Sequence, residues 1–373
     1  MKKQQVSILL AIISLLVLIV PAAAAKPSEQ HASNGAVYIM TNNPSGNNVL
    51  VYSRAADGTL SWTGTFATNG KGATGLAGTN QGALALSRDD KTLLVVNAGS
   101  NDISVFRVNH DGLTLTDKAE SGGTFPISVT IHENIVYVLN AGGTDTGGNI
   151  AGFYLNDDGQ LSAIPGSIQS LSGNVAPAQI SFNPTGSVLV VTEKSTSLID
   201  IYTVDSDGVA TGPTTHASSG TTPFGFAFDN KGQLIVSEAA GGPSGTSAVS
   251  SYSLSRTGDL STLSSSITDT QQAACWLVVT GNGRYAYTAN AHSGTISSYT
   301  IASNGEVTLL QAVAANTGAG NLDLALTRNG GFLYQFINAS HTIEGLSVHS
   351  DGSLTLIDTV TGVPAGADGL AAN

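Results

Sequence analysis

Two glutamates occupy positions where the repeating pattern of this sequence otherwise places asparagine. Short apolar runs recur along the chain, and the polar residues that end one set of them are Asn42, Asn97, Asn140, Glu193, Glu238, Asn290 and Asn338. Two neighbouring carboxylates can share one proton at a raised pKa or hold a divalent cation. We expect Glu193 and Glu238 to lie close together near the mouth of a central channel enclosed by the repeats. Glu193 would act there as general base, and Glu238 would tune the pKa of Glu193 or hold the cation. Solvated loop carboxylates are the alternative.

Further candidate binding residues belong to the same end of the repeat. His292 and His341 lie two or three residues beyond strand-ending asparagines, and Gln179, Asp323 and Asp368 stand at the starts of apolar runs. An asparagine at a strand end commonly satisfies turn backbone groups, and a loop histidine is commonly just exposed. The single cysteine, Cys275, is interpreted as a core thiol, because no basic residue adjoins it in sequence to activate it.

Several chemistries find no matching pattern. No cysteine and histidine spacing suits a structural zinc site, and no G-x-S-x-G nucleophile elbow is present. Glycine clusters fall between strands instead of between a strand and a helix, so they do not resemble phosphate-binding loops. No cofactor is expected, except that a divalent cation at the channel mouth stays open as a purely structural alternative.

A repeated turn indicates the fold. Asp-Gly or a close equivalent, usually followed by Leu or Val, begins at residues 57, 111, 158, 207, 257, 304 and 351, at intervals of about 47–54 residues. Such dipeptides favour tight hairpins, because glycine adopts φ > 0 freely. One repeat reads as four strands near residues 83–86, 93–96, 103–108 and 113–118. Four short strands per repeat of this length predict an all-β, seven-bladed β-propeller with four antiparallel strands per blade.

The two ends of the chain predict how the ring closes. The first strand after the N-terminal segment matches the second strand of the repeat, while residues 364–372 resemble the start of a further repeat. A C-terminal inner strand should therefore join three N-terminal strands, leaving no unpaired inner edge. The predicted organisation is a signal peptide over residues 1–25, a short linker over 26–35 and the propeller over 36–373.

Composition and the N-terminus limit the partners. Lys2 and Lys3 precede an apolar run of about 15 residues and an A-x-A stretch, which is the layout of a secretory signal peptide; an uncleaved membrane anchor is the alternative. The formal charge of −12 becomes −14 after cleavage, which argues against nucleic acid or anionic membranes as partners. We expect a secreted or periplasmic monomer without stable membrane insertion after cleavage.

Residues 177–202 resemble the propeller lactonase family, which includes 6-phosphogluconolactonases and carboxymuconate-cyclising enzymes. The segment P-A-Q-I-S-F-N-P-T-G is similar to the family's P-R-H-L-x-F-H-P-x-G, and a strand ending in Glu193 and then one ending in Tyr202 follow it. The rhythm of all seven repeats is similar too. The family's arginine and histidine correspond to Ala178 and Gln179, and a later arginine corresponds to Ala291. Only Glu193 clearly matches, so an anionic lactone lacks the family's anchor.

Two classes of function follow. The resemblance implies a lactone hydrolase, which on this sequence would act on a neutral or sugar-derived lactone. The alternative is a non-catalytic extracellular propeller that binds a glycan, a cell-wall polymer or a protein, because low charge and Ser/Thr/Asn-rich loops suit that role equally well. The residues alone leave open whether the protein is an enzyme.

Overall fold

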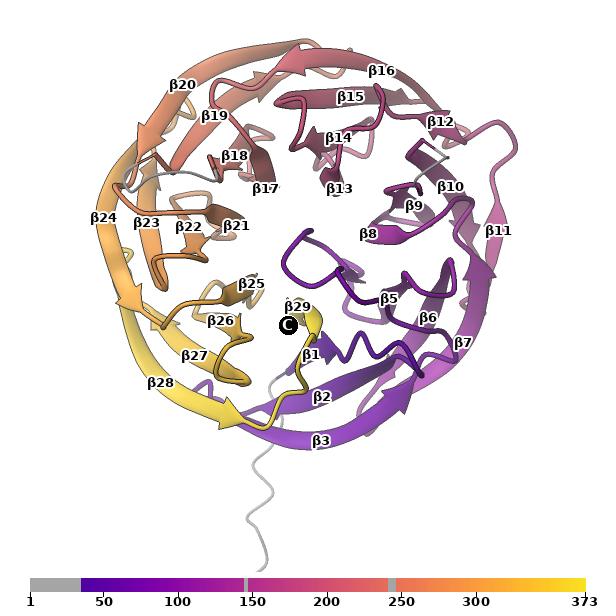
Figure 1. Cartoon of the computed structure of the whole chain (residues 1–373), viewed down its shortest axis with the longest axis horizontal. Coiled ribbons are helices and arrows are strands. Elements are labelled where there is room, and N and C mark those ends of the chain that lie inside the picture. Colours follow the sequence, from indigo (N-terminus) through magenta and orange to yellow (C-terminus); the bar gives the residue numbers. More distant parts are fainter. Residues whose placement is uncertain (1–34, 144–146, 241–245) are drawn as a thin grey trace, which may run out of the picture. The chain divides into compact units, whose positions relative to one another are not determined.

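Seven antiparallel sheets follow one another in this computed structural model, and their inner strands form a closed ring (Figure 1). The structure describes residues 35–143, 147–240 and 246–373; the predicted signal peptide and nearly all of the predicted linker lie outside these residues. Each inner strand contacts the inner strands of both neighbouring sheets, in the order β29, β4, β8, β13, β17, β21 and β25 and back to β29. The described residues contain no helix long and apolar enough to cross a membrane. The all-β, seven-bladed propeller predicted from the repeats is confirmed.

The blades are numbered here along the chain, and blade 2 shows the pattern. It comprises β4 (Leu84–Leu86), β5 (Thr92–Asn97), β6 (Asp102–Asn109) and β7 (Gly112–Glu120), close to the four strands predicted from sequence. The other blades follow in order. Blade 1 holds β29 (Asp368–Ala372), β1 (Ala36–Met40), β2 (Asn48–Arg54) and β3 (Leu60–Ala67). Blade 3 holds β8 (Pro126–His132), β9 (Ile135–Asn140), β10 (Asn149–Leu155) and an outer edge divided into β11 (Leu161–Ala163) and β12 (Gln169–Ser170).

The remaining four blades each have four strands. Blade 4 holds β13 (Pro177–Phe182), β14 (Val188–Glu193), β15 (Leu198–Val204) and β16 (Ala210–Ala217). Blade 5 holds β17 (Pro223–Phe228), β18 (Leu234–Glu238), β19 (Ala248–Leu254) and β20 (Leu260–Thr268). Blade 6 holds β21 (Ala274–Val279), β22 (Tyr285–Asn290), β23 (Thr295–Ile301) and β24 (Val307–Asn316). Blade 7 holds β25 (Asn321–Leu326), β26 (Phe332–Ile337), β27 (Thr342–Val348) and β28 (Leu354–Thr361).

The burial of the strands explains why their sequences differ. The second strand β5 is buried at every position after its first, because the faces of a blade pack against neighbouring blades. The outer strand β28 has no fully buried residue, and exposed residues recur along it. Continuous apolar runs therefore mark the inner part of each blade, and mixed sequences mark the rim.

The predicted ring closure is confirmed. The C-terminal strand β29 pairs with β1 in antiparallel fashion, so that blade 1 combines both ends of the chain. The Ala36 N–H donates to the Asn373 side chain at 2.6 Å, and Arg54 Nε donates to the Asn373 carbonyl at 3.0 Å. These bonds hold the last residue against the start of the propeller.

The connection from blade 1 to blade 2 turns into the centre of the ring. Residues 72–82, called the mouth loop below, lie between β3 and β4 and are seen as the indigo loop near the centre of Figure 1. The loop lies at the end of the ring where the inner strands begin. We call this end the covered mouth and the opposite end the open mouth.

Candidate functional site

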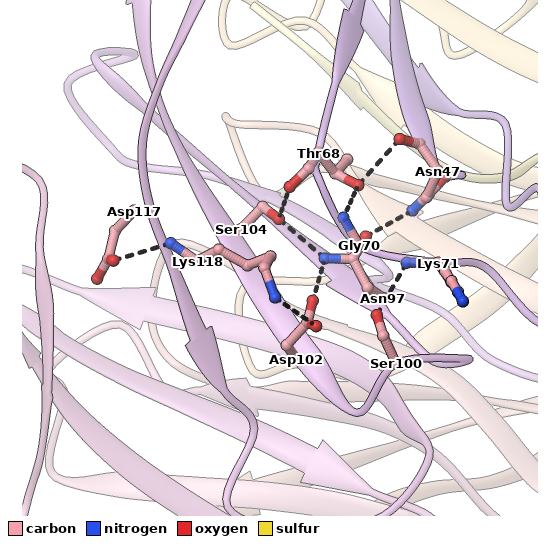
Figure 2. Close-up of polar contacts among 10 residues, drawn as sticks. All are labelled: Asn47, Thr68, Gly70, Lys71, Asn97, Ser100, Asp102, Ser104, Asp117 and Lys118. Carbon is pink, nitrogen blue, oxygen red and sulfur yellow. Dashed lines mark hydrogen bonds and ion pairs between the residues drawn. The ribbon is translucent and has the colours of Figure 1, made fainter. Parts of the chain in front are cut away.

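The polar residue that ends a second strand belongs to a hydrogen-bond network that joins its blade to the connection from the preceding blade. In blade 2, Asn97 pairs with Asp102, the first residue of the third strand, and this location in each blade is called the strand-end position. Asn97 Nδ2 donates to Asp102 Oδ1 at 2.7 Å and to Ser104 Oγ at 2.8 Å, and Ser104 donates to the Thr68 carbonyl of the incoming connection (Figure 2). Lys118 forms an ion pair with Asp102 at 3.0 Å. The network thus fixes the connection between two blades.

Glu193 occupies the strand-end position of blade 4 and is fully buried. Its Oε2 accepts hydrogen bonds from Ser172 Oγ and Thr196 Oγ1, both at 2.7 Å, and its Oε1 accepts one from the Ser172 N–H at 3.3 Å. Asp200 lies beside it, also buried, and burial together with the Glu193 carboxylate raises the pKa of Asp200 well above its ordinary value. Glu193 therefore has a carboxyl neighbour, but that neighbour comes from its own blade.

Glu238 occupies the same position in blade 5 with a separate set of partners. It accepts hydrogen bonds from Ser250, from the Gly220 N–H at 2.8 Å and from Ser266 at 2.7 Å. A Cβ atom at Gly220 would lie 2.1 Å from Glu238 Oε2, so this close approach requires glycine. Glu193 and Glu238 have no hydrogen-bond partner in common among the described residues. The structure does not join them into one pair, and neither carboxylate is solvated.

Two asparagines lie one residue beyond the position expected for them. In blade 7, Ile337 pairs with Thr342 at the strand-end position and Asn338 follows it. In blade 1, Thr41 bonds to Asn48, the first residue of the third strand, and Asn42 follows. Asn42 instead donates to the carbonyls of Ala73 and Gly366, and so links the mouth loop to the last connection of the chain.

The mouth loop is bonded to blades on several sides of the ring. The Gln81 N–H donates to the Ala178 carbonyl of blade 4 at 3.0 Å, and Asn80 Nδ2 donates to the Ile127 carbonyl of blade 3 at 2.7 Å. From blade 6, Trp276 Nε1 donates to the Asn80 carbonyl at 2.9 Å. The Gln81 side chain forms two bonds with the Leu277 backbone, at 2.8 and 3.0 Å. The loop is an integral part of the covered mouth.

Lys194 is a buried basic group at the covered mouth. It follows Glu193, and its Nζ donates to the Thr79 carbonyl of the mouth loop and lies 5.0 Å from the centre of the Phe224 ring. Burial lowers the pKa of Lys194 to about 8. The buried Cys275 thiol lies nearby, and burial raises its pKa to about 12 although the lysine opposes that shift. Cys275 is thus a protonated core thiol at neutral pH, and Lys194 is a desolvated ammonium group.

Asp323 and Asp368 form a buried carboxyl pair under the mouth loop. They are 3% and 1% exposed, and the Leu370 N–H donates to Asp323 Oδ2 at 2.9 Å. Burial raises the pKa of Asp368 to about 7, while the nearby Asn80 amide and the N–H groups of Gly78 and Gly369 partly offset this without hydrogen bonds of normal geometry. Burial, and then the charge of Asp368, raise the pKa of Asp323 well above its ordinary value. The structure brings these two candidates together.

The other candidate residues are dispersed. Gln179 is buried and forms two bonds with the Phe226 backbone, at 2.7 and 3.0 Å, so it links blade 4 to blade 5. His292 is exposed on the turn after β22, and the exposed His341 has its Nδ1 3.1 Å from the Val363 carbonyl. Within the described residues, no three His, Cys, Asp or Glu side chains gather as they would around a metal ion.

Sequence reasoning missed Lys194, Asp200 and the mouth loop. Both residues depart from a repeat, and that departure is a signal that could have found them. Alanine follows the strand-end position in blades 2, 3, 5 and 6, where blade 4 has Lys194, and serine is the third residue of the third strand in blades 2, 5 and 6, where blade 4 has Asp200. The mouth loop left a signal too. The first interval between the repeated turns, from Asp57 to Asp111, is the longest of the series, and the mouth loop lies within it.

Comparison with known proteins places the chain in a family. The model described as "Lactonase, 7-bladed beta-propeller" matches residues 28–163, 148–241 and 236–323. The 6-phosphogluconolactonase of Pectobacterium carotovorum subsp. carotovorum (strain PC1) is 37% identical over 60 residues, which cover 16% of this chain and only 18% of that protein.

Solved structures agree in fold. A candidate 6-phosphogluconolactonase of Bacteroides fragilis NCTC 9343 superposes with a TM-score of 0.72 at 18% identity, covering 93% of this chain and 100% of that one. The periplasmic gluconolactonase of Pseudomonas aeruginosa superposes with a TM-score of 0.68 at 14% identity, covering 89% and 98%. Structural similarity at such low sequence identities shows only that the fold is shared. The family model, by contrast, matches well over half of the sequence, and the chain belongs to the seven-bladed β-propeller lactonase family.

Proposed function

We propose that this propeller hydrolyses a neutral, sugar-derived lactone at the covered mouth once the mouth loop moves aside. One observation carries the proposal: the polar groups of this mouth are bonded to peptide groups of the loop. Lys194 donates to the Thr79 carbonyl and Trp276 donates to the Asn80 carbonyl. A lactone carbonyl and its ring oxygen accept hydrogen bonds of the same kind.

The groups at this mouth fit the charges that ester hydrolysis creates. Attack of water on the lactone carbonyl carbon makes an oxyanion, which the Lys194 ammonium and the Trp276 N–H would stabilise. Asp368, with a pKa of about 7, would take the proton of the attacking water. The ring C–O bond then breaks, and its oxygen takes a proton from the Lys194 ammonium, whose pKa is about 8. The products are a carboxylic acid and an alcohol.

Glu193 receives a positioning role in this proposal instead of the general-base role expected from sequence. It is fully buried and accepts hydrogen bonds from Ser172 and Thr196. Those bonds hold the turn that carries Lys194. In this proposal the proton acceptor is Asp368 on blade 1.

A neutral substrate fits the composition of this mouth. Gln179 stands where the family resemblance places a histidine, and both ends of its amide are occupied by the Phe226 backbone. Ala178 stands where the resemblance places an arginine and is buried. Without a guanidinium at these positions, a phosphate or carboxylate on the substrate would lack a bidentate partner. The names 6-phosphogluconolactonase and gluconolactonase belong to the relatives; for this chain we propose an uncharged aldono-lactone.

The decisive experiment compares lactone hydrolysis by the native protein and matched variants. Lys194→Met removes the ammonium but keeps the chain length, and should lower kcat by about a hundredfold or more. Lys71→Met, an exposed lysine just before the mouth loop, is the control and should leave the rate unchanged. The substrates are aldono-lactones and small aliphatic lactones. Equal rates for the native protein and Lys194→Met would refute the assignment.

A non-catalytic role remains the second candidate, and the mouth loop itself favours it. The loop fills the covered mouth with bonds to blades 3, 4 and 6, as a scaffold would. Gln81→Ala removes the two bonds to Leu277 and should ease loop movement. If neither the native protein nor Gln81→Ala hydrolyses any lactone of the panel, the protein is a binding scaffold.

We also propose that the protein is exported. The support is the signal-peptide pattern over residues 1–25. The Pseudomonas aeruginosa gluconolactonase of the same fold is periplasmic. Fractionation of expressing cells, with N-terminal sequencing of the exported form, tests both the location and the expected cleavage after Ala25.

A further inference from the structure

A large cavity lies at the open mouth, at the end of the ring opposite the mouth loop. Its volume is about 1120 Å³, and it is lined by the turns that join first to second strands in blades 2 to 7. From the axis it continues between blades 2 and 3, where Val105 and Leu155 form part of its walls. Pockets for single small molecules are typically about 300–1,000 Å³, so this elongated space suits a ligand of several units.

The charged side chains of the cavity balance in number. Four are basic: Arg88, Lys91, Arg107 and Arg328. Four are acidic: Asp89, Glu133, Asp157 and Asp229. In a chain with a formal charge of −12, this local balance is a distinctive property of the cavity.

Half of these groups are already engaged. Lys91 lies 3.5 Å from Asp89, and Arg328 Nε bonds to Asp90 at 2.5 Å, which ties the turn of blade 7 to that of blade 2. Asp229 accepts the N–H groups of its own turn. These groups shape the wall instead of offering free bonds.

The other half retain hydrogen-bonding capacity toward the cavity. Among the described residues, Arg88 has no hydrogen bond or ion pair through its side chain, and Arg107 has a single long bond of 3.5 Å to the Asp158 carbonyl. Glu133 and Asp157 likewise have no side-chain partner in the part of the chain that the structure describes. The two donors therefore lie on blade 2 and the two acceptors on blade 3, with neither sign in excess.

This arrangement selects the chemistry of the ligand. An anionic chain would meet Glu133 and Asp157, and a cationic chain would meet Arg88 and Arg107. Hydroxyl groups both donate and accept, so they satisfy all four at once. The partly exposed rings of His132 and Phe228 add apolar surface for the C–H face of a sugar ring.

We propose that the open mouth binds a neutral oligosaccharide of several sugar units between the turns of blades 2 and 3. Arg88 and Arg107 donate to its hydroxyl groups, and Glu133 and Asp157 accept from them. The site is independent of the lactone chemistry proposed for the covered mouth, because the two lie at opposite ends of the inner strands.

The test is isothermal titration of the full mature protein with tetrasaccharides of each charge class. Neutral probes are maltotetraose, cellotetraose, xylotetraose and N-acetylchitotetraose; tetragalacturonate is the anionic probe and glucosamine tetramer the cationic one. At least one neutral probe should bind more tightly than both charged probes. The Arg88→Ala/Arg107→Ala variant should weaken that binding at least tenfold.

The control is Arg256→Ala, which removes an exposed arginine from a turn outside the cavity and should bind as the native protein does. Melting temperatures confirm that all variants are folded. The proposal is overturned if no neutral tetrasaccharide binds at millimolar concentration, if only charged probes bind, or if the double variant binds as tightly as the native protein. Lactonase activity is measured in parallel, and its loss or absence leaves this result unaffected.

Discussion

Replacing Asp368 by asparagine should reveal how much free energy its burial costs. The pKa of this carboxyl is raised from 3.8 to about 7 because the folded protein buries it. A raised folded-state pKa means that the native state holds the proton more tightly than the unfolded chain. The associated stability is fully present below about pH 4 and is lost as the pH rises through 7. About three pKa units correspond to about 4 kcal/mol.

Asp368→Asn keeps the shape and removes the titration. Relative to the native protein, the variant should therefore gain about 4 kcal/mol in free energy of unfolding between pH 4 and pH 7, and the difference should level off above pH 7. Urea unfolding at pH 4, 5.5, 7 and 8.5 measures this difference. Asp111→Asn, whose side chain is 96% exposed, is the control and should differ little from the native protein at any of these pH values. A difference for Asp368→Asn that does not change with pH would refute the reasoning.

Two further predictions concern the packing of the covered mouth. Gly225→Ala places a Cβ atom 1.9 Å from Gln81 Oε1 and 2.7 Å from the backbone carbonyl oxygen of Cys275, so it should destabilise the protein by about 2–3 kcal/mol in urea unfolding. Gly46→Ala, with open space around it, should change stability by less than about 0.5 kcal/mol, and equal effects would contradict this packing. Cys275, with its pKa raised to about 12, should react with a thiol reagent at pH 8 only after unfolding in urea, and fast labelling of the native protein would mean that the mouth opens readily.

The fold could be predicted because its signals are local. Each Asp-Gly turn fixes a hairpin by the backbone freedom of its glycine, as at Gly58 with φ of 88° and Gly352 with φ of 83°. Seven such turns at similar spacing leave few architectures other than a propeller. The ring closure followed from the same pattern, since the missing strand of blade 1 had to come from residues 368–372.

The site was harder to predict because its contacts are not local. The repeat says that Glu193 ends a strand, but whether its side chain meets Glu238 or Asp200 depends on which connection crosses that strand end. The asparagine can also fall one residue beyond the strand end: Ile337, and not Asn338, pairs with Thr342. Asp323 and Asp368 lie on β25 and β29, which are neighbouring inner strands of blades 7 and 1. The repeat predicts that these strands are neighbours, but it does not say that the two side chains meet.

The two ends of the ring place different demands on a ligand. At the covered mouth, a ligand must displace the bonds that Trp276, Gln81 and Asn80 make between the loop and the blades. Each net hydrogen bond contributes about 1 kcal/mol, so about four of them lower the apparent affinity by up to about a thousandfold unless the ligand replaces them. A lactone, with a carbonyl and several hydroxyls, can replace them; a simple hydrocarbon cannot.

Among the described residues, no bonded segment fills the open mouth, and Arg88, which has no side-chain partner among them, is already exposed. Binding there should therefore be insensitive to changes that loosen the mouth loop, whereas lactone hydrolysis should respond to them. Gln81→Ala separates the two: it should lower the KM for a lactone at the covered mouth and leave oligosaccharide affinity at the open mouth unchanged. If both quantities change together, the two ends of the ring are linked through the inner strands, and the independence argued from their separation fails.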